Sequence, residues 1–575
     1  MDYLKQKPYE LNDEAINWVR ETIQNMTIEE KAAQLFIVMN HLTDENDIHK
    51  FLTKYPVGGI RYRNKTAEEV YKQNTAFQKY SKVPIFIAAN CENGADEVCK
   101  EGTFVASEAE LGATDDLQLA RKMGSVCGSE SEALGINWTF SPIVDVYKNS
   151  KNTIVNSRAY GSNPDKIISL SRAYMQGVHN HNLLTCAKHF PGDGVDDRDQ
   201  HLLMAVNDMT WEEWEQSSGK IYRTLIEEGL ESIMVGHIAL PAYVRKRRPD
   251  IPDQEILPAS LSKELIRNLL REEMGFRGLV ITDASHMGGL LGAMPRKQQV
   301  PGVIAAGCDM FLFSHDMEED FQYMIEGISE GVISEARLQE ALEHILGMKA
   351  RLGMYKKKCF TSQKKMNQIG CSEHRKVAEK IAEKGITLVK DVENYLPLNP
   401  KKQPRAKLYF LESEPETRME KPGQVKQIVV KELEQAGFQV DAHESLYELE
   451  WKEVSEKNIP AIMQMPSTER FKANYDVVFV FIYMHGYARE NSVRLKYSFG
   501  HSNELPWWIR EVPTIGVSLN FTNHLYDMPM LKCYINAYAP SKECIHAAVQ
   551  KIVGSTKFEG KYDETVWCGR WDTRI

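Results

Sequence analysis

The sequence predicts an α/β protein built as a (β/α)8 TIM-like barrel followed by an α/β/α sandwich domain. Short apolar runs rich in β-branched residues alternate with helical patterns from residue 35 to residue 313, which is typical of such a barrel. A basic, aperiodic stretch interrupts this alternation near residue 355, and further apolar runs follow it. At 575 residues the chain is too long for one hydrophobic core, so at least two domains are expected.

Eight apolar runs are expected as the barrel strands, at residues 35–38, 59–62, 85–89, 138–144, 183–189, 233–237, 279–283 and 310–313. Helices are expected between them, and several begin with a capping box of threonine and glutamate, at Thr27 with Glu30, Thr66 with Glu69 and Thr210 with Glu213. Segment 261–273 places its leucines on one helical face, and Gly275 is expected to end it. A doubly wound open sheet is the competing fold on periodicity alone.

The predicted domain boundaries are 1–354 for the barrel, 355–375 for a linker and 376–575 for the sandwich. The linker is placed at the lysine-rich segment after Tyr355. Five more apolar runs are expected as sandwich strands, at residues 386–389, 408–411, 477–482, 515–519 and 533–537. Among them, the run VVFVFIY is apolar throughout, which is typical of a strand buried on both faces of a parallel sheet.

Composition argues against several classes of function. The net charge of −10, without a basic aromatic-rich patch, argues against nucleic-acid binding. No apolar run approaches the length of a membrane span, and the first residues show no apolar signal segment, so a cytoplasmic protein without a membrane partner is expected. The ten cysteines lack paired spacing, which indicates reduced, buried thiols. The oligomeric state stays open.

The stretch from residue 186 to residue 201 reads CAKHFPGDGVDDRDQH. A buried strand is expected to end at Lys188 and His189, and the polar loop after it carries Asp193, Asp199 and His201. Barrel enzymes place their chemistry at the carboxyl ends of the strands, so this loop is the first candidate for an active site. A solvated acidic turn is the alternative interpretation.

Other expected strands also end in polar side chains, at Asn90 with Glu92, Asp145, His237, Asp283, and Ser314 with His315. Such a gathering of donors and acceptors suits a polyhydroxylated ligand. Asp283 at the tip of a buried strand is aimed as a nucleophile must be, and His201 has a side chain that can donate and then accept a proton. Asp199 can orient that imidazole. Together these side chains suit glycoside hydrolysis with retention.

These residues resemble glycoside hydrolase family 3, and within it the bacterial β-N-acetylglucosaminidase (β-N-acetylhexosaminidase) branch. The resemblance spans the barrel and rests on the motifs MTIEEKAAQLF, FSPIVDV, NSRAYGSNPDKI, KHFPGDGVDDRDQH and GFRGLVITDASHMGG. It extends more weakly into the second domain through VSLNFTNHLYDMP and YINAY. KHFPG followed by D-x-H is the most specific of these signals.

The resemblance implies a covalent glycosyl-enzyme on Asp283, with Asp199 and His201 as the acid/base dyad. It places Arg158, Lys188 and His189 on positions that hold sugar hydroxyls, and it implies no metal and no organic cofactor. Two positions depart from the family pattern. Asp193 stands where the branch usually has histidine, and Asn90 stands where the family usually has an aspartate that clamps a sugar hydroxyl. Both are expected to contact the sugar, with an altered preference.

The leading interpretation is an exo-acting β-N-acetylhexosaminidase whose partner is a carbohydrate, such as a peptidoglycan or chitin fragment. Water or phosphate would take the sugar from the enzyme. The first alternative is a β-glucosidase or β-xylosidase of the same family, which the two departures favour. The second is a non-catalytic sugar-binding homologue. The third is a hydrolytic metal site formed by His189, Asp193, Asp199 and His201.

Overall fold

The structure is a computed structural model that describes residues 2–356, 363–413, 423–444, 465–486, 488, 492–495, 497 and 504–575. The chain divides into two compact units. The first comprises Met1–Val105, Leu117–Val146 and Asn163–Arg375, and the second comprises Ala106–Asp116, Tyr147–Ser162 and Lys376–Ile575. Two short segments from the first part of the chain therefore belong to the second unit. Residues 357–362 of the expected linker lie outside the described residues.

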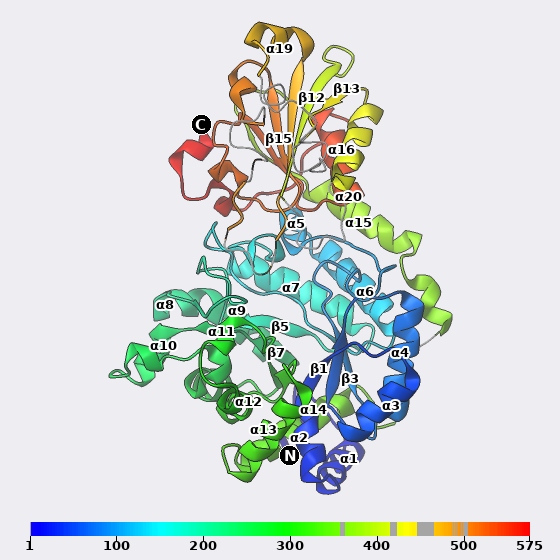
Figure 1. Cartoon of the computed structure of the whole chain (residues 1–575), viewed down its shortest axis with the longest axis vertical. Helices are drawn as coiled ribbons and strands as arrows, with labels where there is room; N and C mark the ends of the chain where they lie inside the picture. The colour runs from blue at the N-terminus through cyan, green and yellow to red at the C-terminus, as the bar shows by residue number, and fades with distance from the viewer. Residues whose placement is uncertain are drawn as a thin grey trace, which may run out of the picture. The chain divides into compact units, whose positions relative to one another are not determined.

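The first unit is a closed barrel of eight parallel strands, of which β1, β3, β5 and β7 are labelled in Figure 1. Its strands are β1 (Phe36–Asn40), β2 (Gly59–Tyr62), β3 (Phe86–Ala89), β4 (Trp138–Thr139), β5 (Cys186–Phe190), β7 (Ser232–Val235), β9 (Leu279–Thr282) and β10 (Phe311–Leu312). They form two ladders, in the order β10-β1-β2-β3-β4 and β5-β7-β9. Isolated bridges join the ladders at both seams, between Trp138 and Leu184 and between Ile143 and Lys188 at one, and between Ile281 and Met310 at the other. The barrel predicted from the sequence is thus confirmed.

The fourth strand differs most from its prediction. It was expected over residues 138–144, but β4 ends at Thr139. Pro142 has no N–H group and cannot donate a hydrogen bond to a neighbouring strand. Beyond β4 the chain therefore makes isolated backbone hydrogen bonds and no continuous ladder. The Phe140 N–H donates to the Ala89 carbonyl at 2.8 Å, and the Val144 N–H donates to the Lys188 carbonyl at 2.9 Å. The segment still runs between β3 and β5, but in irregular form.

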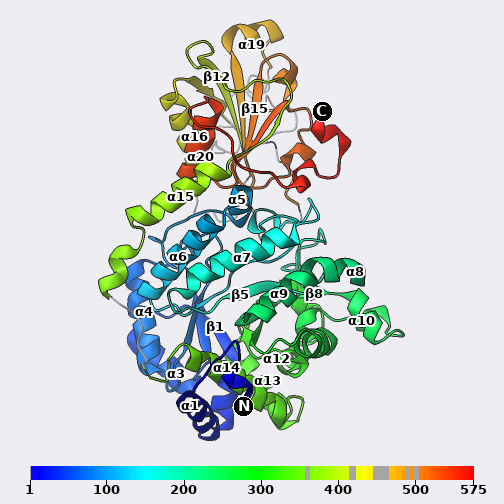
Figure 2. The same cartoon turned by 180° about the vertical axis from the view of Figure 1, so that it is seen from behind.

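Helices surround the barrel, and α6 lies beside α7 (Figures 1 and 2). The α-helices of the first unit are α1 (Asp13–Gln24), α2 (Ile28–Gln34), α3 (Glu45–Lys54), α4 (Ala67–Tyr80), α6 (Leu117–Ala133), α7 (Pro164–His179), α8 (Trp211–Trp214), α9 (Lys220–Glu228), α10 (Pro241–Arg247), α11 (Gly288–Leu291), α12 (Arg296–Ala306), α13 (Met317–Ser329) and α14 (Glu335–Arg351). All three expected capping boxes are present, on α2, α4 and α8. The leucine-rich segment is a π-helix, η6 (Glu264–Glu273), preceded by a separate 3-10 turn at Ala259–Leu261.

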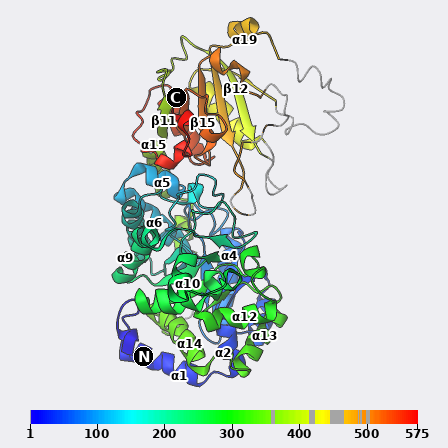
Figure 3. The same ribbon diagram turned by 90° about the vertical axis from the view of Figure 1, so that its left-hand side faces the viewer.

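The second unit contains one six-stranded sheet, whose strands β11, β15 and β12 are labelled in Figure 3. The strands are β11 (Thr387–Asp391), β12 (Arg405–Glu412), β13 (Gln439–Ala442), β14 (Val477–Tyr483), β15 (Thr514–Ser518) and β16 (Cys533–Asn536). Their order is β11-β16-β15-β14-β12-β13, and only the β11–β16 pair is antiparallel. The helices include α5 (Glu108–Thr114), α16 (Gln424–Gln435), α19 (Thr468–Asn474), α20 (Lys542–Ile552) and most of α15 (Ser372–Gly385).

This arrangement confirms the predicted sandwich, with one strand missed. All five expected runs are strands, and six of the seven residues of β14 are buried, as its apolar sequence predicts. The missed strand β13 lies at the edge of the sheet, and its residues alternate between exposed and half-buried. An edge strand of four residues offers too little apolar sequence to be recognised.

Nine cysteines lie within the described residues, all are free thiols, and seven of them are buried. This agrees with the expectation of reduced, buried thiols. Cys359 lies outside the described residues. In the part of the chain that the structure describes, no helix combines the length and the apolar character that crossing a membrane requires.

Candidate active site

Asp283 follows β9 directly, and all four residues of that strand are buried. Its backbone N–H donates to the Val235 carbonyl of β7 at 2.8 Å, which continues the barrel ladder to this residue. The carboxylate is nine-tenths buried, and its Oδ1 accepts the Ala284 N–H at 2.7 Å. Burial alone would raise the pKa of this carboxyl, but nearby histidines, His189 first, outweigh it and hold the pKa below its usual range. Asp283 is therefore an ionised, rigidly aimed carboxylate.

His189 lies at the end of β5 and faces Asp283. Its Nδ1 lies 2.7 Å from Asp145 Oδ2, and its backbone N–H donates to Asp145 Oδ1 at 3.0 Å. Because the carboxylate accepts the Nδ1 proton, Nε2 points the other way, and it lies 3.9 Å from Asp283 Oδ2. Asp145 also accepts the Asp193 N–H at 2.8 Å. Asp145 therefore positions both the imidazole and the start of the loop after β5.

Lys188 forms a buried ion pair with Glu92, from the segment that follows β3. The distance from Lys188 Nζ to Glu92 Oε1 is 2.6 Å, and both side chains are less than one-tenth exposed. Glu92 was expected near a strand end, but not as a member of the site. Glu92 could have been predicted as a site residue, because a lysine buried at the end of a neighbouring strand requires an acidic partner.

Asp199 and His201 form the compact pair that the D-x-H motif predicts. Asp199 Oδ1 accepts the His201 backbone N–H and lies 2.8 Å from His201 Nδ1, while the carboxylate itself is buried. One carboxylate oxygen thus holds both the backbone and the ring of the same residue. Nε2 is left on the far side of the ring, and the His201 side chain is 26% exposed. This nitrogen is available for proton transfer.

Two glycines tie the His201 loop to the turn that begins at Asp283. The Gly288 N–H donates to the His201 carbonyl at 2.8 Å, and the Gly289 N–H donates to the Gln200 carbonyl at 3.1 Å. A Cβ at residue 288 would lie 2.1 Å from the Leu202 carbonyl oxygen, and one at residue 289 would lie 2.9 Å from that of Gln200. Only glycine permits this approach, which explains the Gly-Gly after ASHM.

Gln200, between the two members of the pair, is a positioning residue that the sequence analysis missed. It is fully buried; its Oε1 accepts the His237 N–H at 2.8 Å, and its Nε2 donates to Asp193 Oδ2 at 3.1 Å. Asp193 Oδ1 also accepts the Gly194 N–H at 2.6 Å. The loop after β5 is thus held internally and against the end of β7. No sequence pattern distinguishes this glutamine from a solvated one.

His237 at the end of β7 is a core histidine. Its Nδ1 lies 2.8 Å from Ser260 Oγ, and its Nε2 lies 3.0 Å from the Ala284 carbonyl oxygen. Because a carbonyl only accepts, Nε2 carries the proton and the Ser260 hydroxyl donates to Nδ1. Burial lowers the pKa of this imidazole. His237 therefore fixes the residue that follows Asp283, and both of its nitrogens are used.

Two further predicted residues make contacts of their own. Asn90, at the end of β3, is half-buried and donates from Nδ2 to Glu97 Oε1 at 3.4 Å. Arg158 belongs to the second unit, in Tyr147–Ser162, and its Nη1 donates to the Ile154 carbonyl at 3.3 Å. Within the described residues, no group of three or more His, Cys, Asp and Glu side chains is arranged to hold a metal ion.

Residues 27–348 match the family model described as Glycosyl hydrolase family 3 N terminal domain. The chain belongs to glycoside hydrolase family 3. It is 37% identical, over 99% of both chains, to a protein of Cellulomonas fimi described as Beta-N-acetylglucosaminidase/beta-glucosidase. Among solved structures it is similar to Beta-glucoside phosphorylase BglX, with a TM-score of 0.91 and 36% identity over the whole of both chains.

A family 3 β-N-acetylglucosaminidase from Paenibacillus sp. str. FPU-7 shares the fold, with a TM-score of 0.77 and 23% identity over 93% of this chain and 98% of that one. Family 3 membership makes this chain a glycosidase and confirms the resemblance drawn from KHFPGDGVDDRDQH and TDASHM. Within the family 3 barrel, a rigid carboxylate and a histidine with one open nitrogen lie on two loops that are bonded together. Displacement at a sugar carbon needs a nucleophile and a proton donor of this kind.

Proposed function

We propose that this chain is a retaining exo-glycosidase that releases a terminal β-linked N-acetylglucosamine from small oligosaccharides. Asp283 is the nucleophile, and His201, oriented by Asp199, is the general acid and base. The pair of backbone hydrogen bonds from Gly288 and Gly289 carries the proposal, because it holds the His201 loop against the turn that begins at Asp283.

In the first step an Asp283 oxygen attacks the anomeric carbon, and the bond from that carbon to the glycosidic oxygen breaks. The proton on His201 Nε2 passes to the departing oxygen, so the aglycone leaves as a neutral alcohol. Before this transfer the ring carries protons on both nitrogens, and the Asp199 carboxylate stabilises that cation through the Nδ1–H. The product of the step is a glycosyl ester of Asp283.

In the second step water attacks the anomeric carbon of this ester. His201 Nε2, now unprotonated, takes a proton from the water, and the bond to Asp283 breaks. The carboxylate returns to its ionised form beside His189, whose Nε2 lies 3.9 Å from it. The low pKa of Asp283 supports both steps, because the group is ionised before attack and is stable as it leaves.

The proposed sugar contacts of the first unit are Lys188, His189, Asn90 and Asp193. The buried pair of Lys188 and Glu92 offers a donor beside an acceptor, which suits a sugar hydroxyl that needs both. His189 is held by Asp145, so it can contact the sugar without losing its orientation. Asp193 already accepts hydrogen bonds from Gly194 and Gln200, and a sugar contact would add to these.

Trapping of the covalent intermediate tests the nucleophile. A 2-deoxy-2-fluoro glycoside with a good leaving group should form a stable ester, because the fluorine slows both steps through the charge-deficient transition state. Mass spectrometry of the intact chain and of its peptides should place the added sugar on Asp283. A label on another residue, or no label on an active preparation, contradicts the assignment. Sugar binding without turnover of any aryl glycoside would make the chain a non-catalytic homologue.

The leaving group tests the acid. We expect His201→Ala to lose about 10²- to 10⁴-fold in kcat/KM on a substrate with a poor leaving group, and much less on an activated aryl glycoside that needs little protonation. His49→Ala is the matched control, because His49 is an exposed histidine of α3 whose ring packs against Tyr80. Equal losses on both substrates would show that His201 is not the proton donor.

A β-glucosidase activity is the second candidate for the glycone. The departures at Asn90 and Asp193 favour it, and the similar protein of Cellulomonas fimi carries both activities in its description. A comparison of kcat/KM for p-nitrophenyl β-glucoside and its N-acetylglucosamine analogue decides between them. A much higher value for the glucoside would overturn the N-acetylglucosaminide assignment.

Phosphate is the second candidate for the acceptor. An imidazole repels an incoming anion less than a carboxylate base would, and the similar structure BglX is described as a β-glucoside phosphorylase. Reactions with and without inorganic phosphate, analysed for sugar 1-phosphate, test this acceptor. If phosphate changes neither the rate nor the products, water is the acceptor.

A further inference from the structure

Three leucines near the candidate active site are exposed. Leu202 is 38% exposed, Leu203 is 40% exposed and Leu291 is 45% exposed. Only three other large apolar side chains of the first unit, within its described residues, are exposed to this degree, at Ile28, Leu117 and Val332. Exposed apolar side chains that gather in one place mark a site of contact more often than scattered ones do.

The backbone brings the three leucines together. Leu202 follows His201, and a Cβ at Gly288 would lie only 2.1 Å from the Leu202 carbonyl oxygen. Gly288 begins the one-turn helix α11, and Leu291 ends it. Leu291 is therefore one helical turn from the point where the two segments meet.

Backbone hydrogen bonds also fix the turn that carries Leu202 and Leu203. The N–H groups of Leu202 and Leu203 both donate to the Asp199 carbonyl, at 2.9 Å and 3.1 Å. The turn is thus anchored to the buried residue that also orients His201. The leucines cannot be buried by a shift of this turn without breaking the contacts that place the imidazole. Their exposure is a consequence of the loop's fixed position.

We propose that Leu202, Leu203 and Leu291 form an apolar aglycone subsite, so that the enzyme accepts β-glycosides of an apolar alcohol or phenol in addition to small oligosaccharides. This inference rests on the assignment of His201 as the proton donor. A general acid lies within about 3 Å of the oxygen that it protonates, so the aglycone begins next to His201 Nε2. The side chains that flank His201 consequently flank the aglycone. In the same loop Arg198 pairs with Asp196 at 2.9 Å, so these two charges compensate each other.

A series of n-alkyl β-glycosides from ethyl to octyl tests the subsite, with the glycone that the enzyme cleaves fastest. The leaving-group chemistry is nearly constant along this series, so a change in kcat/KM reports apolar contact. We expect kcat/KM of the full chain to rise up to about fourfold per methylene over the first few carbons. In Leu202→Ser and Leu291→Ser the octyl-to-ethyl ratio should fall at least about tenfold. This ratio compares two substrates on one preparation, so a smaller folded fraction does not alter it.

Val332→Ser is the matched control, because Val332 is 49% exposed but belongs to the connection between α13 and α14 and not to the segments after β5 and β9. It should leave the ratio unchanged. A flat series in the wild-type chain, or an unchanged ratio in both leucine variants, overturns the inference. The inference is also overturned if the leucine variants change the oligomeric state in sedimentation and leave the octyl-to-ethyl ratio unchanged. That result would make the three leucines an interface between copies of the chain. The proposed function is tested separately by the trapping experiment, and it fails if no glycosyl ester forms on Asp283.

Discussion

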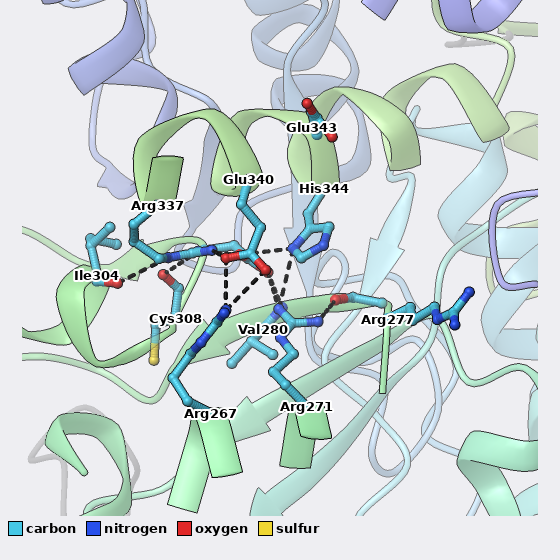
Figure 4. A network of polar contacts seen from close by, with 12 residues as sticks. Arg267, Arg271, Arg277, Val280, Ile304, Cys308, Arg337, Glu340, Glu343 and His344 are labelled. Carbon is cyan, nitrogen blue, oxygen red and sulfur yellow. Dashed lines mark hydrogen bonds and ion pairs between the residues drawn. The ribbon is translucent and has the colours of Figure 1, made fainter. Parts of the chain in front are cut away.

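The two ends of the barrel carry the same kinds of side chain and arrange them differently. At the amino end of the strands Asp309 precedes β10, and Arg271, Arg337 and His344 converge on it; Figure 4 shows these last three side chains. Asp309 is fully buried, and it also accepts the Val280 N–H at 2.8 Å. Its burial would raise the pKa of the carboxyl, but His344 and the two arginines outweigh it and hold the pKa well below the usual range.

Glu231 repeats this arrangement before β7. It contacts His179 at 3.0 Å, Arg351 at 3.0 Å and the Thr185 hydroxyl at 2.7 Å, and it is 1% exposed. Despite burial, the His179 and Arg351 charges lower the pKa of Glu231 to about 2. Both carboxylates at this end are thus paired with basic side chains, and removal of either carboxylate would leave those side chains without their partner.

Asp283 at the carboxyl end is surrounded more openly. Among the described residues its oxygens receive one hydrogen bond, from Ala284, and the His189 Nε2 atom lies 3.9 Å from Oδ2. The carboxylates of Asp309 and Glu231 are structural, because basic side chains bind their oxygens. The Asp283 carboxylate can react, because its Oδ2 has no hydrogen bond or ion pair closer than the 3.9 Å to His189 among the described residues.

The largest contrast is expected between Asp283→Asn and Asp309→Asn. The first should reduce kcat by about 10⁴-fold or more and leave the free energy of unfolding nearly unchanged. The second should lower the free energy of unfolding by about 3–5 kcal/mol, because it leaves two buried arginines without their shared anion. Urea denaturation and steady-state kinetics on both variants measure the contrast. If Asp283→Asn is the more destabilised variant, the comparison of the two ends is wrong.

Glu231 should make the free energy of unfolding depend on pH in the acidic range. The pKa of Glu231 is lower in the folded chain than the ordinary 4.5, so its stabilisation is present above pH 4.5 and is lost as the pH falls toward 2. The difference corresponds to about 3 kcal/mol at neutral pH. Glu231→Gln should lose this amount at pH 7 and show a flatter dependence between pH 4.5 and 2. Parallel curves for the variant and the wild-type chain would contradict this account.

Gly288→Ala tests whether the tie between the two loops positions His201. The added Cβ would meet the Leu202 carbonyl oxygen at 2.1 Å, so one of the loops must move. A displacement of about 1 Å can cost about 10²-fold in rate, and we expect this loss on substrates with poor leaving groups. On activated aryl glycosides the loss should be smaller. Gly302→Ala in α12 is the matched control, since its Cβ would meet only side-chain atoms, at 3.3 Å and beyond.

The smallest effect is expected at Ser260, which donates to His237 in a fully satisfied pair at the catalytic end. Ser260→Ala should lower the free energy of unfolding by about 1 kcal/mol, the typical value of one hydrogen bond. Activity should fall by less than about tenfold, because the Ala284 carbonyl still holds Nε2. A loss comparable to that of His201→Ala would show that His237 acts on the substrate.

Much of the barrel could be predicted from local sequence. All eight strands were expected close to their observed positions, since a short apolar run bounded by turns is a local signal. The capping boxes on α2, α4 and α8 were also recognised, because their partners are three residues apart. Predictions failed where the pattern was weak or was altered by packing, as in edge strand β13, shortened β4 and π-helix η6.

The partners within the site were harder to predict. Asp145 was expected only at a strand end, but it holds His189, and Lys188 pairs with Glu92. Gln200 had no expected role, although it joins the loop after β5 to the end of β7. These pairs join residues up to about a hundred positions apart, and no spacing along the chain encodes them.

The sequence by itself determined which chemical groups stand at the strand ends, because strand, turn and polar loop follow one another locally. It also determined the orientation of His201 by Asp199, since a carboxylate two residues earlier reaches both the backbone and the ring. Only the tertiary structure decided which of these groups meet. Closure of the barrel sets the neighbours of each strand, and the close approach at Gly288 and Gly289 then places the loops of β5 and β9 together.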